Sequence, residues 1–250
     1  MITEKRPGRF RKYFLYAIGE IALVMIGILL ALQVNNWNEA GKARQQEIKI
    51  YREILSDLKV TLQEVNHDMQ YHQSVLERTQ HLIDHITEKK PFTDSLIFDF
   101  IGTQSDLQVY PKTSGYEALN SLGLNLLSND SVRIKITDLY QLSLKRLVEI
   151  GYRETPSDDL RALVGPYLQE HIQMDTDKDN RRIMDYIIDS VEVYGPEFAD
   201  YDSFINDREL LRMLNYSVLR RAAKIRVHHT TARSVDQTIA SIQNELKRIE

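Results

Sequence analysis

The sequence contains no cysteine and few residues that interrupt helices, with six prolines and ten glycines among 250 residues. Without cysteine the chain forms no disulfide and cannot carry a lipoprotein-type anchor. Leucine, isoleucine, glutamate, lysine, arginine and glutamine are abundant instead. Because these residues favour helices, the composition predicts an all-α fold.

An excess of basic charge is also lacking outside the N-terminal part of the chain. The whole sequence has 32 Lys and Arg against 36 Asp and Glu. The N-terminal part accounts for five basic and two acidic residues, namely Lys5, Arg6, Arg9, Arg11, Lys12, Glu4 and Glu20. The remaining body therefore has 27 basic and 34 acidic residues. Such an acidic body lacks the basic surface that nucleic acids bind, so we expect no nucleic-acid partner.

One long hydrophobic run dominates the N-terminal part. Phe14–Leu32 is apolar throughout except for Glu20. At about 1.5 Å per residue it extends roughly 28 Å, enough to cross the hydrocarbon core of a bilayer. We therefore predict a transmembrane helix over residues 13–34 in a lipid bilayer. Because basic residues beside a membrane span stay inside, residues 1–12 should form a cytoplasmic tail and the body should lie outside.

A cleaved signal peptide is the alternative interpretation of this run. Signal peptides usually have an apolar region of about 7–15 residues and small residues at the cleavage site. Here the run is longer, and it ends in Gln33-Val34-Asn35-Asn36-Trp37 with no A-x-A pattern. We therefore expect an uncleaved anchor.

Glu20 is the strongest candidate for a functional residue. A carboxylate at this depth costs about 2.5–3.5 kcal/mol on insertion scales, and residues 13–33 contain no Lys or Arg to pair with it. Gly27 and Ala31 lie on the same side of the helix and permit close helix approach, and Gly19 sits beside them. We predict an intramembrane interface through Gly19, Glu20, Gly27 and Ala31, with self-association or another membrane subunit as the partner. There are two alternatives to this interface. Glu20 could belong to a ring of carboxylates that conducts ions, or it could be protonated and have no function.

Two segments outside the anchor have apolar residues at alternating steps of three and four, which indicates a coiled coil or a long hairpin. The first set is Ile48, Tyr51, Leu55, Leu58, Leu62, Val65, Met69, His72, Leu76, Thr79, Ile83 and Ile86. The second set is Leu211, Leu214, Val218, Ile225, Ala232, Val235, Ile239, Ile242, Leu246 and Ile249. We predict stalk helices over residues 35–90 and 207–250 that pair antiparallel, with Ile249 near Ile48.

Between these helices, residues 91–206 should form a helical head at the far tip of the stalk. Pro91 cannot extend the first stalk helix, and Asn206 with Glu209 forms a capping box for the last one. Helix starts inside the head are indicated by Ser114–Glu117, by Asn129 or Asp130, and by Thr155–Pro156. The segment 183–191 favours a helix but leaves a strand open.

Several motifs resemble a known family. The anchor reads Tyr16-Ala-Ile-Gly-Glu20-Ile, then Ile26-Gly-Ile, then Ala31-Leu-Gln-Val-Asn-Asn-Trp-Asn-Glu39. Lys112-Thr-Ser-Gly-Tyr-Glu-Ala-Leu119, Asn129-Asp-Ser-Val-Arg133 and the ending Ile242-Gln-Asn-Glu-Leu-Lys-Arg-Ile249 complete the likeness. Together they resemble an uncharacterised family of single-pass membrane proteins from Bacteroidetes. The resemblance implies a bacterial inner-membrane protein with a periplasmic helical body, and it implies no activity.

Histidines and acidic residues offer three weaker patterns. His81 and His85 have an i,i+4 spacing that can hold a metal, but without a third ligand we expect solvated side chains. His72 falls within about a turn of His228 in the antiparallel register, so a buried pH-sensitive pair is an alternative to ordinary packing. The stretch 175–180 imitates a calcium loop, yet it lacks the glycine and the final glutamate, so a helix-capping turn is expected.

No nucleophile elbow, phosphate loop, zinc-hydrolase motif or dinucleotide fingerprint occurs in the sequence. We therefore expect no catalytic, cofactor-binding or metal-binding residues, and a tethered hydrolase has no supporting motif. The leading hypothesis is a non-enzymatic, membrane-anchored periplasmic scaffold or sensor, homo-oligomeric through its anchor. The alternative is an oligomeric membrane component that conducts ions or protons through Glu20.

Overall fold

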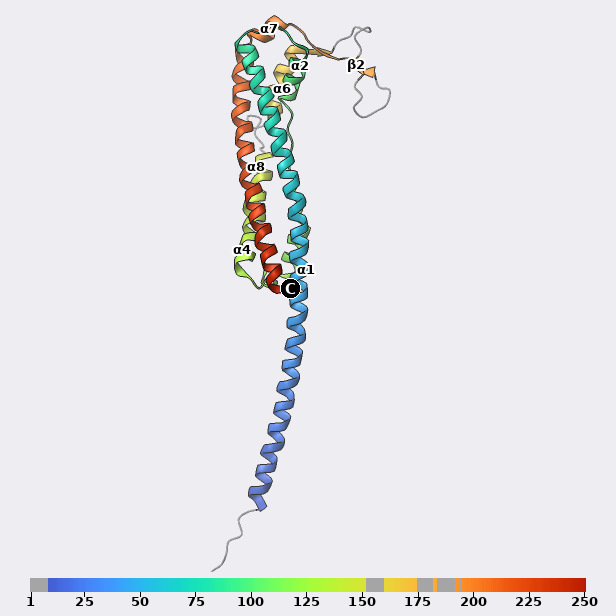
Figure 1. The fold of residues 1–250 in the computed structure, drawn as a ribbon, viewed down its shortest axis with the longest axis vertical. Coiled ribbons are helices and arrows are strands. Elements are labelled where there is room, and N and C mark those ends of the chain that lie inside the picture. The colour runs from blue at the N-terminus through green and yellow to red at the C-terminus, as the bar shows by residue number, and fades with distance from the viewer. Residues whose placement is uncertain (1–8, 152–159, 175–181, 184–191, 194) are drawn as a thin grey trace, which may run out of the picture.

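A computed structural model describes residues 9–151, 160–174, 182–183, 192–193 and 195–250. Two long helices dominate it: α1 (Arg9–Thr87) and α8 (Arg208–Ile249). They run antiparallel, and the C-terminus lies beside the middle of α1 (Figure 1). Arg52 Nη2 donates to Glu250 Oε1 at 2.9 Å, and Ile48 packs against the same core as Ile249. The predicted hairpin and its register are therefore confirmed.

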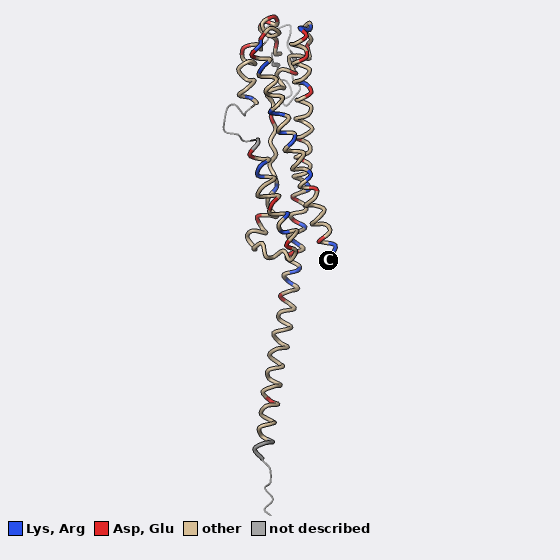
Figure 2. Tube along the Cα trace, turned by 90° about the vertical axis from the view of Figure 1, so that its left-hand side faces the viewer, with Lys and Arg blue, Asp and Glu red and all other residues tan. Residues whose placement is uncertain are grey.

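The N-terminal part of α1 stands alone. Side chains 13–43 are exposed, and charged residues are almost absent from the lower part of the helix in Figure 2. Of the described helices, α1 is the one that is long and apolar enough to cross a membrane. It continues from the apolar run into the bundle as one helix of 79 residues. The apolar run, which is the predicted anchor, and the first stalk helix thus form a single rod.

Shorter elements lie between α1 and α8 along the sequence. They are α2 (Asp94–Gly102), α3 (Ser114–Leu122), the 3₁₀ turn η1 (Leu124–Leu126), α4 (Asp130–Asp138), the π-helical turn η2 (Leu139–Leu144), α5 (Lys145–Gly151), α6 (Leu160–His171) and α7 (Tyr201–Asn206). Two antiparallel strand pairs join β1 (Ile172–Met174) to β4 (Pro196–Phe198) and β2 (Arg182–Ile183) to β3 (Glu192–Val193). With strands this short, the all-α expectation is confirmed.

The segment 91–206 is not confined to the tip, which corrects the expectation of a separate head. The backbone N–H of Ser128 donates to Glu47 Oε1 at 2.7 Å, at the anchor end of the hairpin. Elements α3 to α5 pack along the hairpin, and α2, α6 and α7 cover its far end. The physical reason is that two helices alone leave an apolar face uncovered, and the returning chain buries it.

Two apolar cores result, one at each end of the bundle. The core at the anchor end includes Ile50, Ile54, Leu58, Leu119, Ile136, Val235 and Ile242. The core at the far end includes Leu82, Leu96, Phe100, Val164, Phe204, Leu210 and Leu214. A small cluster of Val65, Val109, Leu147 and Ala232 lies apart from both.

One close approach fixes α3 against α1. A Cβ added at Gly115 would lie 2.7 Å from the backbone nitrogen of Ile54 and 2.9 Å from the carbonyl carbon of Glu53. Only glycine leaves room for the two backbones at this distance. Beside it, Asp57 Oδ2 accepts hydrogen bonds from Ser114 Oγ at 2.7 Å and from the Gly115 N–H at 2.8 Å. The anchor-end core is therefore closed by backbone contact as well as by side chains.

The helix starts differ slightly from those expected. Asp207, and not Asn206, caps α8, since its Oδ1 accepts from the N–H groups of Glu209 and Leu210 at 2.9 Å. Helix α3 follows Thr113, whose hydroxyl donates to Glu117 Oε1 at 2.6 Å. Asn129 caps α4 as one of the two expected candidates. Thr155–Pro156 and the stretch 175–180 lie outside the described residues, as does most of 183–191.

Candidate functional site

Between the two cores, charged and polar side chains cross the bundle in one layer. We define the polar layer as Asp68 and His72 of α1, Asp106 and Gln108 of the segment 103–113, and Arg221, Lys224 and His228 of α8. Asp68, His72, Arg221, Lys224 and His228 are all buried. Burying charges costs free energy unless each is paired, so the contacts of this layer decide what it can do.

Arg221 is held by three acceptors although only 1 % of it is exposed. Its Nη2 donates to the carbonyl oxygens of Thr103 at 3.1 Å and Ser105 at 2.8 Å, and its Nη1 donates to His72 Nδ1 at 2.8 Å. Arginine stays protonated in proteins, so Nδ1 of His72 must be the acceptor. His72 is therefore neutral and carries its proton on Nε2. Burial first, and then the neighbouring Arg221, lower its pKa to about 3.

His228 lies against His72, with ring centroids 5.3 Å apart. The Nδ1–H of His228 donates to the carbonyl oxygen of Lys224 at 2.8 Å, which leaves Nε2 as an acceptor. That Nε2 is buried and has no hydrogen-bond partner among the described residues. Burial lowers the pKa of His228 as well. The pair that the sequence left as an alternative is thus brought together, with both rings neutral.

Lys224 and Asp106 form an ion pair that joins two elements of the layer. Lys224 Nζ of α8 donates to Asp106 Oδ2 of the segment 103–113. The other oxygen of Asp106 lies 3.8 Å from His72 Nε2. Because Arg221 and Lys224 are both engaged, neither is free to act on a substrate. The layer therefore ties α1, α8 and the segment 103–113 into one register.

A surface hollow opens beside this layer. It has a volume of about 380 Å³ and lies between α1 and the segment 103–113. Glu64 and His67 stand at its α1 side, and Tyr110, which is 70 % exposed, at the other. Asp68 and Gln108 line it too. Asp68 Oδ2 and Gln108 Nε2 are buried, and neither atom has a hydrogen-bond partner within the described ranges. Burial raises the pKa of Asp68.

The predicted intramembrane residues stay apart from this site. Gly19, Glu20, Gly27 and Ala31 all lie on the exposed part of α1, and open space surrounds both glycines. In helical geometry Gly27 and Ala31 lie within roughly 20° of the direction of Glu20, whereas Gly19 lies about 100° away. Glu20 makes no hydrogen bond or ion pair with the part of the chain that the structure describes.

His81 and His85 differ from the expectation of two solvated side chains. His81 is exposed and contacts Asp99 Oδ2 at 3.2 Å. His85 is 3 % exposed, and its Nε2–H donates to the Tyr201 hydroxyl at 2.8 Å, which in turn donates to the carbonyl oxygen of Lys90 at 2.5 Å. His85 is buried because α7 folds over the end of α1. The residues next to His85 in the sequence do not reveal this contact.

At the same end, Glu170, His171 and Asp207 bring a nitrogen and two carboxylate oxygens within 4.8 Å of one another. His171 Nε2–H donates to Asp207 Oδ2 at 2.8 Å, and the other oxygen of Asp207 caps α8. Burial alone would raise the pKa of Asp207, but the N–H groups of Leu210 and Glu209 and the bond from His171 lower it. These bonds give His171 and Asp207 a structural role in fastening α6 to α8.

Sequence reasoning missed Asp68, Asp106, Gln108, Arg221 and Lys224. Charged residues on amphipathic helices usually face water, so the pattern placed them on the surface. The one signal was the polar His72 at a heptad core position. Since a polar core residue needs a partner, it could have prompted a search for facing polar residues on α8.

Comparison with known proteins adds a family and no activity. No curated protein and no solved structure matches the chain. The sequence model of a family of unknown function, DUF6090, matches residues 20–158, which is more than half of the chain. The matched range begins inside the apolar part of α1 and extends through α5. The protein belongs to the DUF6090 family.

Proposed function

We propose that the protein is a non-enzymatic, membrane-anchored scaffold or sensor. Its N-terminus lies in the cytoplasm, its apolar segment crosses the inner membrane, and its helical bundle lies in the periplasm. The resemblance of the anchor motif to single-pass proteins of Bacteroidetes and the basic residues before the run support this placement.

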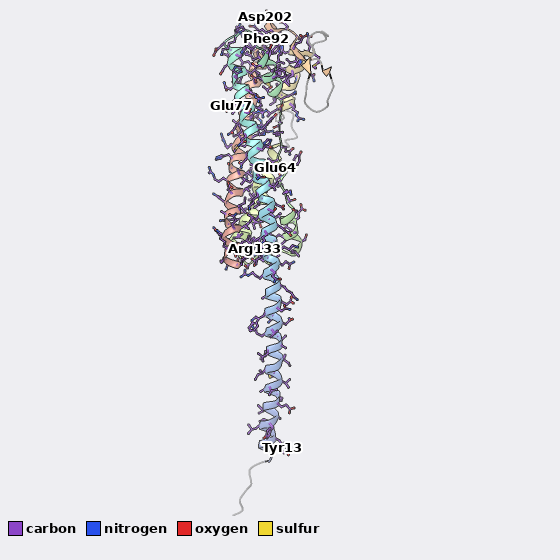
Figure 3. All side chains as sticks on the ribbon, turned by 45° about the vertical axis from the view of Figure 1, so that its right-hand side comes forward. Tyr13, Glu64, Glu77, Phe92, Arg133 and Asp202 are labelled. Carbon is purple, nitrogen blue, oxygen red and sulfur yellow. The ribbon has the colours of Figure 1, made fainter. Side chains whose placement is uncertain are left out.

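The uninterrupted α1 carries the proposal. An exposed apolar segment of membrane-spanning length continues directly into a helix that is buried by α8 and α3. A rotation or tilt of the anchor is thereby passed to the bundle, and a change in the bundle is passed to the anchor. Figure 3 shows the continuous helix, with Tyr13 near its lower end and Glu77 far along it in the bundle.

The way in which Arg221, Lys224 and His72 are bonded in the polar layer supports a non-enzymatic role. A general base or nucleophile must reach a substrate, whereas Arg221, Lys224 and His72 of this layer are buried and bonded to protein groups. A buried polar layer has a well-attested use in fixing helix register. A change of partner there would shift α1 against α8, as a sensor requires.

Self-association through the face of Glu20, Gly27 and Ala31 completes the proposal. This face has small residues that permit close approach, and Glu20 has no partner among the described residues of its own chain. Cross-linking of the full-length protein in liposomes tests it. Ala31→Leu should weaken cross-linking, whereas Ala22→Leu, on the opposite face by helical geometry, should not.

Substitutions of Glu20 distinguish an anchor that associates from an anchor that conducts protons. If it joins anchors, Glu20→Leu should weaken cross-linking and Glu20→Gln should largely preserve it, with a partial loss because interhelical hydrogen bonds average about 0.6 kcal/mol. If Glu20 conducts protons, both variants should abolish proton flux in liposomes and leave cross-linking intact. Equal cross-linking by Ala31→Leu and Ala22→Leu would refute the proposed interface.

A further inference from the structure

A short exposed segment of α1 lies between the predicted anchor and the bundle. We define the neck as residues 35–46, which extend roughly 18 Å along the helix. The side chains of the neck are exposed except for that of Arg44, which is half-buried, and the bundle begins at the buried Glu47. Figure 1 shows α1 continuing below the C-terminus as a bare helix.

The neck is a poor helix on its own. It contains Asn35, Asn36, Asn38 and Gly41, which are residue types with low helix propensity. An exposed helix this short is marginal in water, and packing against another surface is what usually stabilises one. Because α1 is nevertheless continuous through these residues, the neck needs a packing partner.

One face of α1 repeats through both the anchor and the neck. Alternating steps of three and four residues join Ala31, Val34, Asn38, Gly41 and Gln45. Continued toward the N-terminus at the same steps, this line passes through Gly27, Val24 and Glu20. The spacing is that of the a and d positions of a coiled coil. We call this line of positions the seam.

The bundle packs on the opposite side of α1. By helical geometry the buried residues Glu47, Ile50 and Ile54 point roughly 140–160° away from the direction midway between Gly41 and Gln45. Helices α8 and α3 therefore cover the side of α1 that faces away from the seam. A Cβ added at Gly41 would meet nothing within 4 Å among the described residues. A second helix can thus approach the seam without displacing the bundle.

The seam fits a second copy of this chain. Membrane insertion gives every copy the same direction, so two anchors that meet along Gly27 bring their necks together in parallel and at equal height. Asn38 then faces Asn38 of the other copy, and an amide side chain can both donate to and accept from its twin. In the order of the steps, Asn38 falls at an a position, where a single asparagine specifies the register and the number of strands.

The residues beside the seam agree with this partner and limit the contact. Trp37 and Lys42 hold the flanking g and e positions, so Trp37 of one copy faces Lys42 of the other, where a cation can lie on the indole ring. Beyond Gln45 the a positions continue as Arg52 and Lys59, which are both exposed, and like charges repel each other across the pair. The contact therefore ends near Gln45, and the two bundles diverge above it.

We propose that the neck joins two copies of this chain as a parallel two-stranded coiled coil, in which Asn38 of one copy is hydrogen-bonded to Asn38 of the other. The inference rests on the proposed function, because it extends the association face of Glu20, Gly27 and Ala31 out of the membrane. It adds the number of copies, their direction and the residue that sets their register. A rotation of the paired anchors then reaches both bundles together.

Disulfide cross-linking of the full-length protein in liposomes tests this contact. Because the sequence contains no cysteine, each introduced cysteine is the only one in its chain. Asn38→Cys and Gln45→Cys change seam positions, whereas Asn36→Cys and Gln46→Cys change the same residue types on other faces of the helix. A disulfide needs its Cβ atoms about 3.5–4.5 Å apart, so each seam cysteine should form dimers at least about tenfold faster than its control.

An introduced charge tests the role of Asn38. Asn38→Asp, combined with Gln45→Cys, places two carboxylates against each other and should slow cross-linking at position 45 by at least about fivefold. Asn36→Asp, combined with the same cysteine substitution, is the matched control and should leave the rate unchanged. Circular dichroism should show equal helix content for the two double variants.

A cysteine inside the anchor separates this inference from the proposed function, with Val24→Cys on the seam and Ala22→Cys on the opposite face. Equal rates for Asn38→Cys and Asn36→Cys, or an unchanged rate with Asn38→Asp, would overturn the inference. Faster cross-linking by Val24→Cys than by Ala22→Cys, without any such difference in the neck, refutes the inference alone. Selective cross-linking in the neck with equal rates for Val24→Cys and Ala22→Cys refutes the proposed anchor interface alone.

Discussion

The rings of His72 and His228 meet edge to face, with centroids 5.3 Å apart and an interplanar angle of 69°. The two residues come from the two long helices, His72 from α1 and His228 from α8, and lie in the layer that separates the two apolar cores. Arg221 on α8 and Lys224 one turn before His228 place positive charge beside them, while Asp68 and Asp106 supply the negative charge. Both imidazoles are held neutral by burial and by these cations.

This arrangement predicts a loss of stability in mild acid. An unfolded histidine binds a proton near its ordinary pKa of about 6.5, whereas folded His72 does so at about 3. Between these values the unfolded state binds more protons, so the free energy of unfolding falls as the pH drops below about 6.5. The fall approaches about 1.4 kcal/mol per pH unit for one such histidine. Denaturant unfolding of the full-length protein at several pH values measures it.

His72→Gln should flatten this pH dependence, since it removes the titrating ring, and His67→Gln on the exposed surface should not. Asp68 acts in the opposite direction, because its raised pKa lets the folded state bind a proton first as the pH falls. Both His72→Gln and the unaltered protein contain Asp68, so its effect on the free energy of unfolding cancels when the two are compared. Identical slopes for the two proteins would contradict the assignment of His72 as a buried neutral residue.

The anchor-end core predicts a contrast between two leucines of α1. Leu58 is fully buried, whereas Leu62 is only partly buried against the same core. Leu58→Ala should lower the free energy of unfolding by about 2–5 kcal/mol, because it leaves a cavity. Leu62→Ala should cost less, about 1–2 kcal/mol, since less apolar area is lost from a site that already faces water. Chemical unfolding followed by circular dichroism compares the two, and an equal cost would argue against this packing.

The close contact of α3 with α1 predicts that adding one methyl group at Gly115 lowers the free energy of unfolding strongly. Gly115→Ala places a Cβ against the backbone of Ile54 and Glu53, which cannot give way as a flexible side chain can. The helices must separate, at a cost of about 1–3 kcal/mol. Gly102→Ala at the end of α2 is the control, because nothing lies within 4 Å of its added Cβ. Similar unfolding midpoints for the two variants would show that α3 does not approach α1 this closely.

The long-range plan of the fold could be predicted from the sequence because it depends on periodicity. Positions 51, 58, 65, 72, 79 and 86, which recur every seven residues, are buried as expected. The intervening positions shift by one residue, so Ile54 and Leu82 are fully buried while Leu55 packs only partly against the core. The shift arises because α1 packs against α8 and the segment 91–147 at once, and a two-helix pattern contains no information about that second neighbour.

Buried polar residues were the part that periodicity could not predict. Glu47, Asp57 and Thr61 lie on the buried face of α1 because they bind the returning chain, at Ser128, Gly115 and Lys112. Each bond joins residues far apart in the sequence, and each carboxylate alone resembles a surface residue. Apart from the pair His72 and His228, the polar layer escaped prediction for the same reason, since its members come from three separate segments.

The most direct test of the account is the side of the membrane on which the bundle lies. Alkaline phosphatase fused after Glu250 of the full chain should be active, because this enzyme matures only in the periplasm, and a fluorescent protein that folds in the cytoplasm should stay dark at the same position. The C-terminus lies beside α1 where the bundle begins, so the reporter sits on the same side as the bundle (Figure 1). An inactive phosphatase with a bright fluorescent fusion would place the bundle in the cytoplasm and contradict the proposed anchor topology.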